Sequence, residues 1–191
     1  RPFFVQALEM ANGLGEDFYA VDAVHMLAII AEPASALTLN LQAIQLAESS
    51  GQEKARNWLG SLYNNMGWVY HDMREYESAL KIFEKAEAFR MENGTVDRRR
   101  IATWCVARTL RSLNRIEEAL SKQMILKAEL ESAGETDGYV FEEIGECLFA
   151  LKREEEARPY FAKAYEVLSQ DEFLVEQEPN RLARLNQLGS E

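Results

Sequence analysis

The chain has 191 residues, of which 47% are hydrophobic and 28% charged, and its net charge is −11 at neutral pH. This length suffices for one continuous core, and the acidic balance argues against general nucleic-acid binding, in which basic residues neutralise phosphates. The longest apolar run, near residues 26–31, is too short to span a membrane, and nothing resembles a signal peptide. Two cysteines, Cys105 and Cys147, do not suggest a disulfide framework. We therefore expect a cytoplasmic protein that binds neither membranes nor nucleic acid.

Four short segments of the chain repeat the same pattern around an alanine. The alanines are Ala36, Ala79, Ala119 and Ala157, which lie 43, 40 and 38 residues apart. A recurrence at about 40 residues is typical of a stacked array of repeats. Apolar residues spaced by three, four and seven positions mark one face of a helix. Each unit is therefore predicted to be a first helix, a tight turn and a second helix.

Small residues occupy equivalent places in three of the predicted first helices. Gly67, Ala107 and Gly145 each lie twelve residues before one of the repeated alanines. Because protein interiors are close-packed, a residue without a large side chain allows a neighbouring helix to approach closely. We therefore predict close helix contacts at these three positions.

The predicted elements follow one another in a regular order. They are a partial repeat with only its second helix at 1–14, repeats at 17–50, 60–93, 100–133 and 138–171, and a capping helix at 179–188. The missing first helix of the partial repeat suggests that residues upstream would complete it. A terminal cap is expected because the last apolar face of a repeat array must be shielded. Pro159 lies inside a predicted helix and should kink it locally.

The motifs in these repeats resemble those of a known family. Asn65-Met-Gly-x-x-Tyr, followed by Tyr76-x-x-Ala-Leu-x-x-Phe-x-x-Ala, is similar to the tetratricopeptide repeat (TPR), as is Gly145-x-x-Leu with Ala157-x-x-x-Phe-x-x-Ala. The NNMG and YESAL segments resemble kinesin light-chain repeats and bacterial TPR proteins of unassigned activity. The resemblance implies a single all-α domain over 1–191, a right-handed α-α superhelix of antiparallel helix pairs.

The resemblance also implies that the first helix of each repeat lines a concave groove that holds a peptide or helix of another protein. Helical spacing identifies the inward positions: Asp22, His25 and Ile29 in the first repeat, Ser61, Asn64, Asn65, Trp68, His71 and Asp72 in the second, Trp104, Cys105, Arg108, Arg111 and Ser112 in the third, and Glu142, Glu143, Glu146 and Phe149 in the fourth. From these positions we predict a partner-binding groove composed of Asn64, Asn65, Trp68, His71, Trp104, Arg108, Arg111, Glu142 and Glu146.

The asparagines and tryptophans of this set each have two interpretations. An amide donates and accepts hydrogen bonds at once, so Asn64 and Asn65 could pair with the backbone of a bound peptide. Alternatively, they bond to a neighbouring helix. Trp68 and Trp104 could anchor a partner, since tryptophan dominates binding hot spots. Alternatively, they pack between the repeats.

The arginines of this set also have two interpretations. Arg108 and Arg111 could hold an acidic side chain or a terminal carboxylate of a partner, because arginine forks suit carboxylates. Alternatively, they form internal ion pairs with Glu142, Glu143 and Glu146 on the next first helix. The lysines with which some TPR proteins clamp a terminal carboxylate have no counterpart here.

No catalytic constellation accompanies these residues. His71 and Asp72 are adjacent in sequence and so point to different helix faces, and neither a phosphate loop nor zinc-ligand spacing occurs. We therefore expect a non-catalytic interaction module without cofactor or metal. The alternatives are a self-associating scaffold, such as a homodimer, or the docking or sensor portion of a larger regulatory protein.

Overall fold

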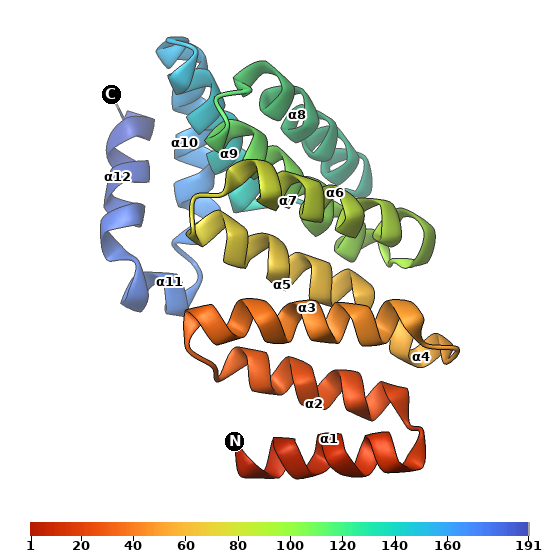
Figure 1. Ribbon diagram of the computed structural model, residues 1–191. Helices are drawn as coiled ribbons and strands as arrows, with labels where there is room; N and C mark the ends of the chain where they lie inside the picture. The colour runs from red at the N-terminus through yellow and green to blue at the C-terminus, as the bar shows by residue number, and fades with distance from the viewer. Residues whose placement is uncertain (191) are drawn as a thin grey trace. The chain divides into compact units, whose positions relative to one another are not determined.

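The computed structural model describes residues 1–190, except for the side chains of Pro33 and Ala34. Over this range the chain forms helices and no strands, which confirms the all-α prediction (Figure 1). The helices gather into two compact units, Arg1–Ala102 and a second that begins at Thr103. A single continuous domain over the whole chain therefore stays a prediction.

The first unit consists of antiparallel helix pairs. Its helices are α1 (Pro2–Leu14), α2 (Asp17–Ile29), α3 (Pro33–Ser49), α4 (Glu53–Arg56), α5 (Leu59–Asp72), α6 (Tyr76–Asn93) and the first part of α7 (Val96–Ser112). Helix α2 packs against α1 and α3, and α5 packs against α3 and α6 (Figure 1). Val24, Ala43, Leu62 and Met66 lie in the core that these helices enclose.

The second unit continues the pairing. It contains the rest of α7, then α8 (Ile116–Ala133), α9 (Gly138–Ala150), α10 (Glu154–Leu168), α11 (Glu172–Gln177) and α12 (Pro179–Ser190). Helix α9 packs against α8 and α10, and α12 packs against α10. Helix α10 runs through Pro159 without interruption. The apolar face of α12 buries Leu182 and Leu185 in the core of this unit.

Three of the helix pairs are joined by the same three-residue turn. Its middle residue is Arg74, Asn114 or Lys152, each with φ between 60° and 63°. The residue that follows donates a backbone hydrogen bond of 2.9 Å to the residue five positions earlier, as Glu75 does to Tyr70. Left-handed backbone is unfavourable for non-glycine residues, so its recurrence shows that the helix pairs impose the turn. The connection between α2 and α3 has no such residue.

The predicted close helix contacts occur in both repeats that carry glycine. A Cβ on Gly67 would lie 2.5 Å from the Phe83 ring, and a Cβ on Gly145 would lie 2.8 Å from the Phe161 ring. Both rings are almost fully buried. Glycine therefore makes room for an aromatic side chain that lies sixteen residues further along the chain.

The third repeat has a different pair of residues in this register. Ala107 takes the place of the glycine, and Gln123 takes the place of the phenylalanine. The Gln123 side chain is fully buried, and neither its Nε2 nor its Oε1 has a hydrogen-bond partner among the described residues. Leaving such a buried polar group unsatisfied costs about 1–3 kcal/mol.

We therefore expect Gln123→Met to stabilise the chain. Methionine has nearly the length and shape of glutamine but no amide to desolvate, so the free energy of unfolding should rise by about 1 kcal/mol. Urea unfolding followed by circular dichroism measures the change. The same substitution at the exposed Gln42 is the control and should give no such gain. A destabilised Gln123→Met variant would contradict this interpretation.

Candidate functional site

One face of α5 borders three adjoining pockets in the first unit. Trp58, Ser61, Asn65, Trp68 and Asp72 lie at spacings of three and four residues, which places them along one side of the helix. The amino-terminal pocket shares Ser61 with the middle pocket, and the middle pocket shares Asn65 with the carboxy-terminal pocket. We call the three pockets together the α5 groove.

The carboxy-terminal pocket is the largest of the three, at about 760 Å³. Its wall is mainly apolar and includes Ile29, Trp68, Val69 and Met73. Ile29 and Met73 are 61% and 49% exposed. These apolar side chains lie together at a cavity, so a partner could bury apolar side chains of its own against them.

One residue in the wall of the carboxy-terminal pocket departs from the repeat pattern. Asn40, which borders it, occupies the register of Phe83 and Phe161. Its amide donates a 2.9 Å hydrogen bond to the carbonyl oxygen of Ala36 within α3. The first repeat thus presents a short polar side chain where two other repeats bury an aromatic ring.

Trp68 links this pocket to the core of its own repeat. The half-buried indole meets the Phe83 ring edge-on, with ring centroids 5.2 Å apart. His71, a further predicted groove residue, lies 5.1 Å from Trp68 and 5.0 Å from Tyr76. Trp68 therefore lines a pocket and also packs within its own repeat, and its role as a partner anchor stays a prediction.

The middle pocket, of about 210 Å³, is basic, with two arginines and no acidic residue in the lining that the structure describes. Both predicted asparagines border it, together with Ser61, Arg90 and Arg98. The Asn65 side chain makes no hydrogen bond among the described residues. Its amide is available on the wall that the middle and carboxy-terminal pockets share.

The amino-terminal pocket, of about 230 Å³, is lined in part by Trp58, behind which lies a buried histidine. His25 is 9% exposed, and its ring lies 5.2 Å from that of Trp58, which lines this pocket. Its Nδ1 has no hydrogen-bond partner among the described residues. Burial lowers the pKa of His25 below the ordinary value, and the carboxylate of Asp22 opposes this effect in part.

His25 should lower the free energy of unfolding in mild acid. Because the folded-state pKa lies below the unfolded value near 6.5, the unfolded chain binds more protons between the two values. The contribution of neutral His25 is complete above about pH 6.5 and is lost as the pH falls toward the folded-state pKa. Urea unfolding at pH 7.5 and 5.0 should show a smaller acid loss for His25→Phe, which keeps the ring. An equal loss in both proteins would contradict this prediction.

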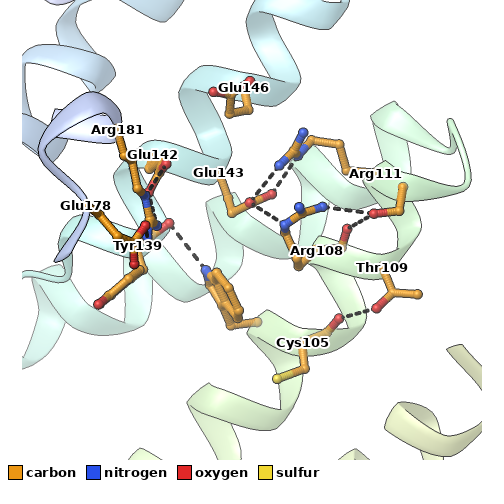
Figure 2. Close-up of polar contacts among 12 residues, drawn as sticks. Cys105, Arg108, Thr109, Arg111, Tyr139, Glu142, Glu143, Glu146, Glu178 and Arg181 are labelled. Carbon is orange, nitrogen blue, oxygen red and sulfur yellow. Dashed lines mark hydrogen bonds and ion pairs between the residues drawn. The ribbon is translucent and has the colours of Figure 1, made fainter. Parts of the chain in front are cut away.

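An internal ion-pair cluster in the second unit contains Glu143 and two of the predicted groove residues, Arg108 and Arg111 (Figure 2). Arg111 donates from Nε and Nη2 to the Glu143 carboxylate at 2.7 and 2.9 Å, and the Arg108 Nε lies 3.1 Å from the same group. The Glu143 side chain is only 5% exposed. Its hydrogen bond and charge raise the pKa of Arg111 despite burial. Of the two interpretations of Arg108 and Arg111, the structure therefore shows internal ion pairs.

The terminal helix α12 engages the other predicted acidic residues. Arg181 donates from Nε to the Glu142 carboxylate at 2.9 Å (Figure 2). Arg184, further along the same helix, pairs with Glu146. The Arg181 guanidinium also lies 5.2 Å from the centre of the Tyr139 ring. Helix α12 therefore covers the acidic side of α9 with its own arginines.

Trp104 is also held within the second unit. Its Nε1 donates a 3.3 Å hydrogen bond to the Tyr139 carbonyl oxygen, and the two rings meet edge-on at 6.2 Å. The indole packs against the core that contains Leu126 and Val140. Trp104 thus joins α7 to the start of α9.

The predicted set of groove residues is therefore divided by the structure. Asn64, Asn65 and Trp68 line the α5 groove, whereas the predicted residues of the second unit make contacts within that unit. Arg90 and Met73, which also line the α5 groove, are absent from the set predicted from the sequence. Arg90 had a signal, because it continues the buried stripe of α6 that contains Ala79, Phe83 and Ala86.

Among residues 1–190, no group of three or more histidine, cysteine, aspartate or glutamate side chains is arranged to hold a metal ion. In the same range no helix is both long and apolar enough to cross a membrane. Burial raises the pKa of the Cys147 thiol to about 12, so this thiol is not poised as a nucleophile.

Comparisons with known proteins agree with this architecture. Residues 60–88 and 140–167 match the family model described as tetratricopeptide repeat. These ranges cover most of the α5–α6 and α9–α10 pairs. No curated protein matches the sequence. TPR repeats are generally protein–protein interaction modules.

Solved structures share the fold at low identity. BtubC (BKLC) from P. vanneervenii is 16% identical over 98% of this chain and 79% of its own, with a TM-score of 0.76. The TPR-like repeats of a kinesin light-chain-like protein from Podosopora anserina are 14% identical over 88% and 86%, with a TM-score of 0.63. The MamA protein is 15% identical over 93% and 94%, with a TM-score of 0.57. The two matched ranges are thus tetratricopeptide repeats, and the solved structures share the all-α repeat fold of this chain.

Proposed function

We propose that the chain is a non-catalytic interaction module that binds an extended or helical segment of another protein in the α5 groove. The observation that carries the proposal is the three adjoining pockets along one face of α5. A helix of fourteen residues is about 21 Å long, so a groove beside it can accommodate several residues of a peptide.

The apolar pocket supplies the main contact in this proposal. A partner side chain that entered it would bury apolar surface against Ile29, Trp68 and Met73. Burial of apolar area is the chief favourable term in most protein association. The ring of Trp68 is held by Phe83, so little of its freedom would be lost on binding.

Asn65 supplies backbone recognition in this proposal. Its amide can donate to a peptide carbonyl and accept from a peptide N–H at the same time. It stands between the basic middle pocket and the apolar carboxy-terminal pocket. The partner segment would therefore cross Asn65 with one side chain toward each pocket.

The predicted groove residues of the second unit have a lesser part in the proposal. A partner that contacted Arg108, Arg111, Glu142 or Glu146 would have to compete with existing ion pairs. We therefore place the first contacts of the partner on α5. The scaffold role, the absence of catalysis and the cytoplasmic location are parts of the same proposal.

Selection from a displayed peptide library, followed by affinity measurement, tests this function. The double variant Ile29→Ser/Met73→Ser removes exposed apolar groups from the pocket wall and should weaken selected peptides by about tenfold or more. Asn65→Ala should weaken them as well. Met91→Ser, at a residue that is 53% exposed and lines none of the three pockets, is the matched control. Peptides that bind all variants equally would place the site elsewhere.

Self-association is a second candidate, which the exposed apolar side of α1 favours. Phe3, Met10 and Leu14 are 80%, 67% and 75% exposed and lie at helical spacing. A second copy that covered this side would form a homodimer. Light scattering over a hundredfold range of concentration should then show a rising mass, and a constant monomer mass would exclude the homodimer.

A further inference from the structure

The middle pocket of the α5 groove is rich in hydrogen-bond donors and contains no carboxylate in its lining. Ser61, Asn65, Arg90 and Arg98 contribute from three helices, α5, α6 and α7. The chain as a whole carries a net charge of −11, so a pocket with two arginines and no acid is a local reversal of charge. Such a wall suits a group that only accepts hydrogen bonds.

Arg90 is the buried member of this wall. It is 7% exposed, and its Nη2 donates a 3.0 Å hydrogen bond to the hydroxyl of Ser61. Among the described residues it forms no ion pair with a carboxylate. Burying an arginine without a counter-charge is unfavourable, and long charged side chains are rarely buried unless paired.

The backbone of α5 is built to admit this guanidinium. A Cβ on Gly60 would lie 2.3 Å from the guanidinium carbon of Arg90, so any larger residue would displace it. Arg98 lines the same pocket from α7, and burial, together with the charge of Arg98, lowers the pKa of Arg90. A bound anion would offset both the burial and the repulsion.

We propose that the middle pocket is an oxyanion subsite, which receives a carboxylate or phosphoryl group of the bound segment. Arg90 would supply the fixed charge at its base, and the more exposed Arg98 would close over the oxyanion. The subsite would be part of the partner-binding groove. The identity of its natural ligand, a group on the partner segment, therefore rests on the proposed function. Its chemistry can be tested apart from that function, since a small oxyanion should bind alone.

Titrating the whole chain with inorganic phosphate, and separately with acetate, tests the subsite by nuclear magnetic resonance at constant ionic strength. The amides of Gly60 and Ser61 and the side-chain Nε–H groups of Arg90 and Arg98 should shift and saturate. Tighter binding of phosphate would identify a phosphoryl source, and binding of acetate at least as tight would identify a carboxylate source. If neither ion gives a saturable shift, the subsite does not exist.

A pair of adjacent arginine variants separates the subsite from general attraction. Arg98→Gln should weaken phosphate or acetate binding by about tenfold or more, the usual effect of losing a charge-assisted hydrogen bond. Arg99→Gln changes the net charge equally but alters a residue outside the pocket lining, so affinity should be retained. Equal weakening in the two variants would overturn the proposal. Ion binding without any selected peptide would instead leave the subsite intact and count against the peptide-binding function.

Discussion

Glu143→Gln is expected to lower the free energy of unfolding by about 3 kcal/mol, because it leaves two arginines without their shared carboxylate. The side chain of Glu143 is almost fully buried, accepts hydrogen bonds from Nε and Nη2 of Arg111, and forms an ion pair with Arg108. Glutamine keeps the shape but cannot neutralise either guanidinium. Removing one member of a buried ion pair is costly even where the intact pair adds little net stability.

Urea unfolding followed by circular dichroism measures the effect of Glu143→Gln. Glu118→Gln is the matched control, because it breaks a bidentate pair with Arg115 on the exposed surface. Exposed pairs are screened by solvent, so the control should unfold as the wild type does. A Glu143→Gln variant as stable as the control would show that the cluster in Figure 2 is not a structural element of the second unit.

Gly67→Ala is the second prediction with a large expected effect. The added methyl group would lie 2.5 Å from the buried ring of Phe83, so either the ring or α5 must move. Overpacking of this kind costs about 1–3 kcal/mol, although alanine is the better helix former by about 1 kcal/mol. After this gain is subtracted, we expect a net loss of stability of about 1 kcal/mol.

A double-mutant cycle isolates the contact between these two residues. The third repeat pairs Ala107 with the unbranched Gln123 in the same register, which suggests that alanine requires a flexible partner. Gly67→Ala combined with Phe83→Met should therefore be less destabilised than the sum of the two single variants. Additive losses in the urea midpoints would mean that this contact does not limit the approach of α5 to α6.

Much of the helical architecture could be predicted from the sequence. The repeated alanines and the small residues at Gly67 and Gly145 arise from local packing, which leaves a periodic signal. The short helices α4 and α11 left no comparable signal, because four and six residues are too few to show helical periodicity. The left-handed turns at Arg74, Asn114 and Lys152 carry no glycine and so had no local marker.

The candidate site was predictable only along α5. Helical spacing was sufficient to select Asn65 and Trp68, because both lie on the helix that borders the pockets. The contribution of Arg90 depends on the approach of α6 to Gly60, which spacing within a single helix cannot reveal. The partners of Glu142 and Glu146 come from α12, 38 or 39 residues further along the chain.

Site-specific photo-cross-linking in a cell lysate tests most directly whether the α5 groove binds a partner. A photoreactive residue at Asp72, in the wall of the apolar pocket, should yield a discrete adduct with another protein. That adduct should weaken when Ile29→Ser and Met73→Ser are added. The same photoreactive residue at the exposed Lys81 on α6, which lines none of the three pockets, should yield none. Adducts formed only from Lys81, or equally from both positions, would contradict binding in the α5 groove.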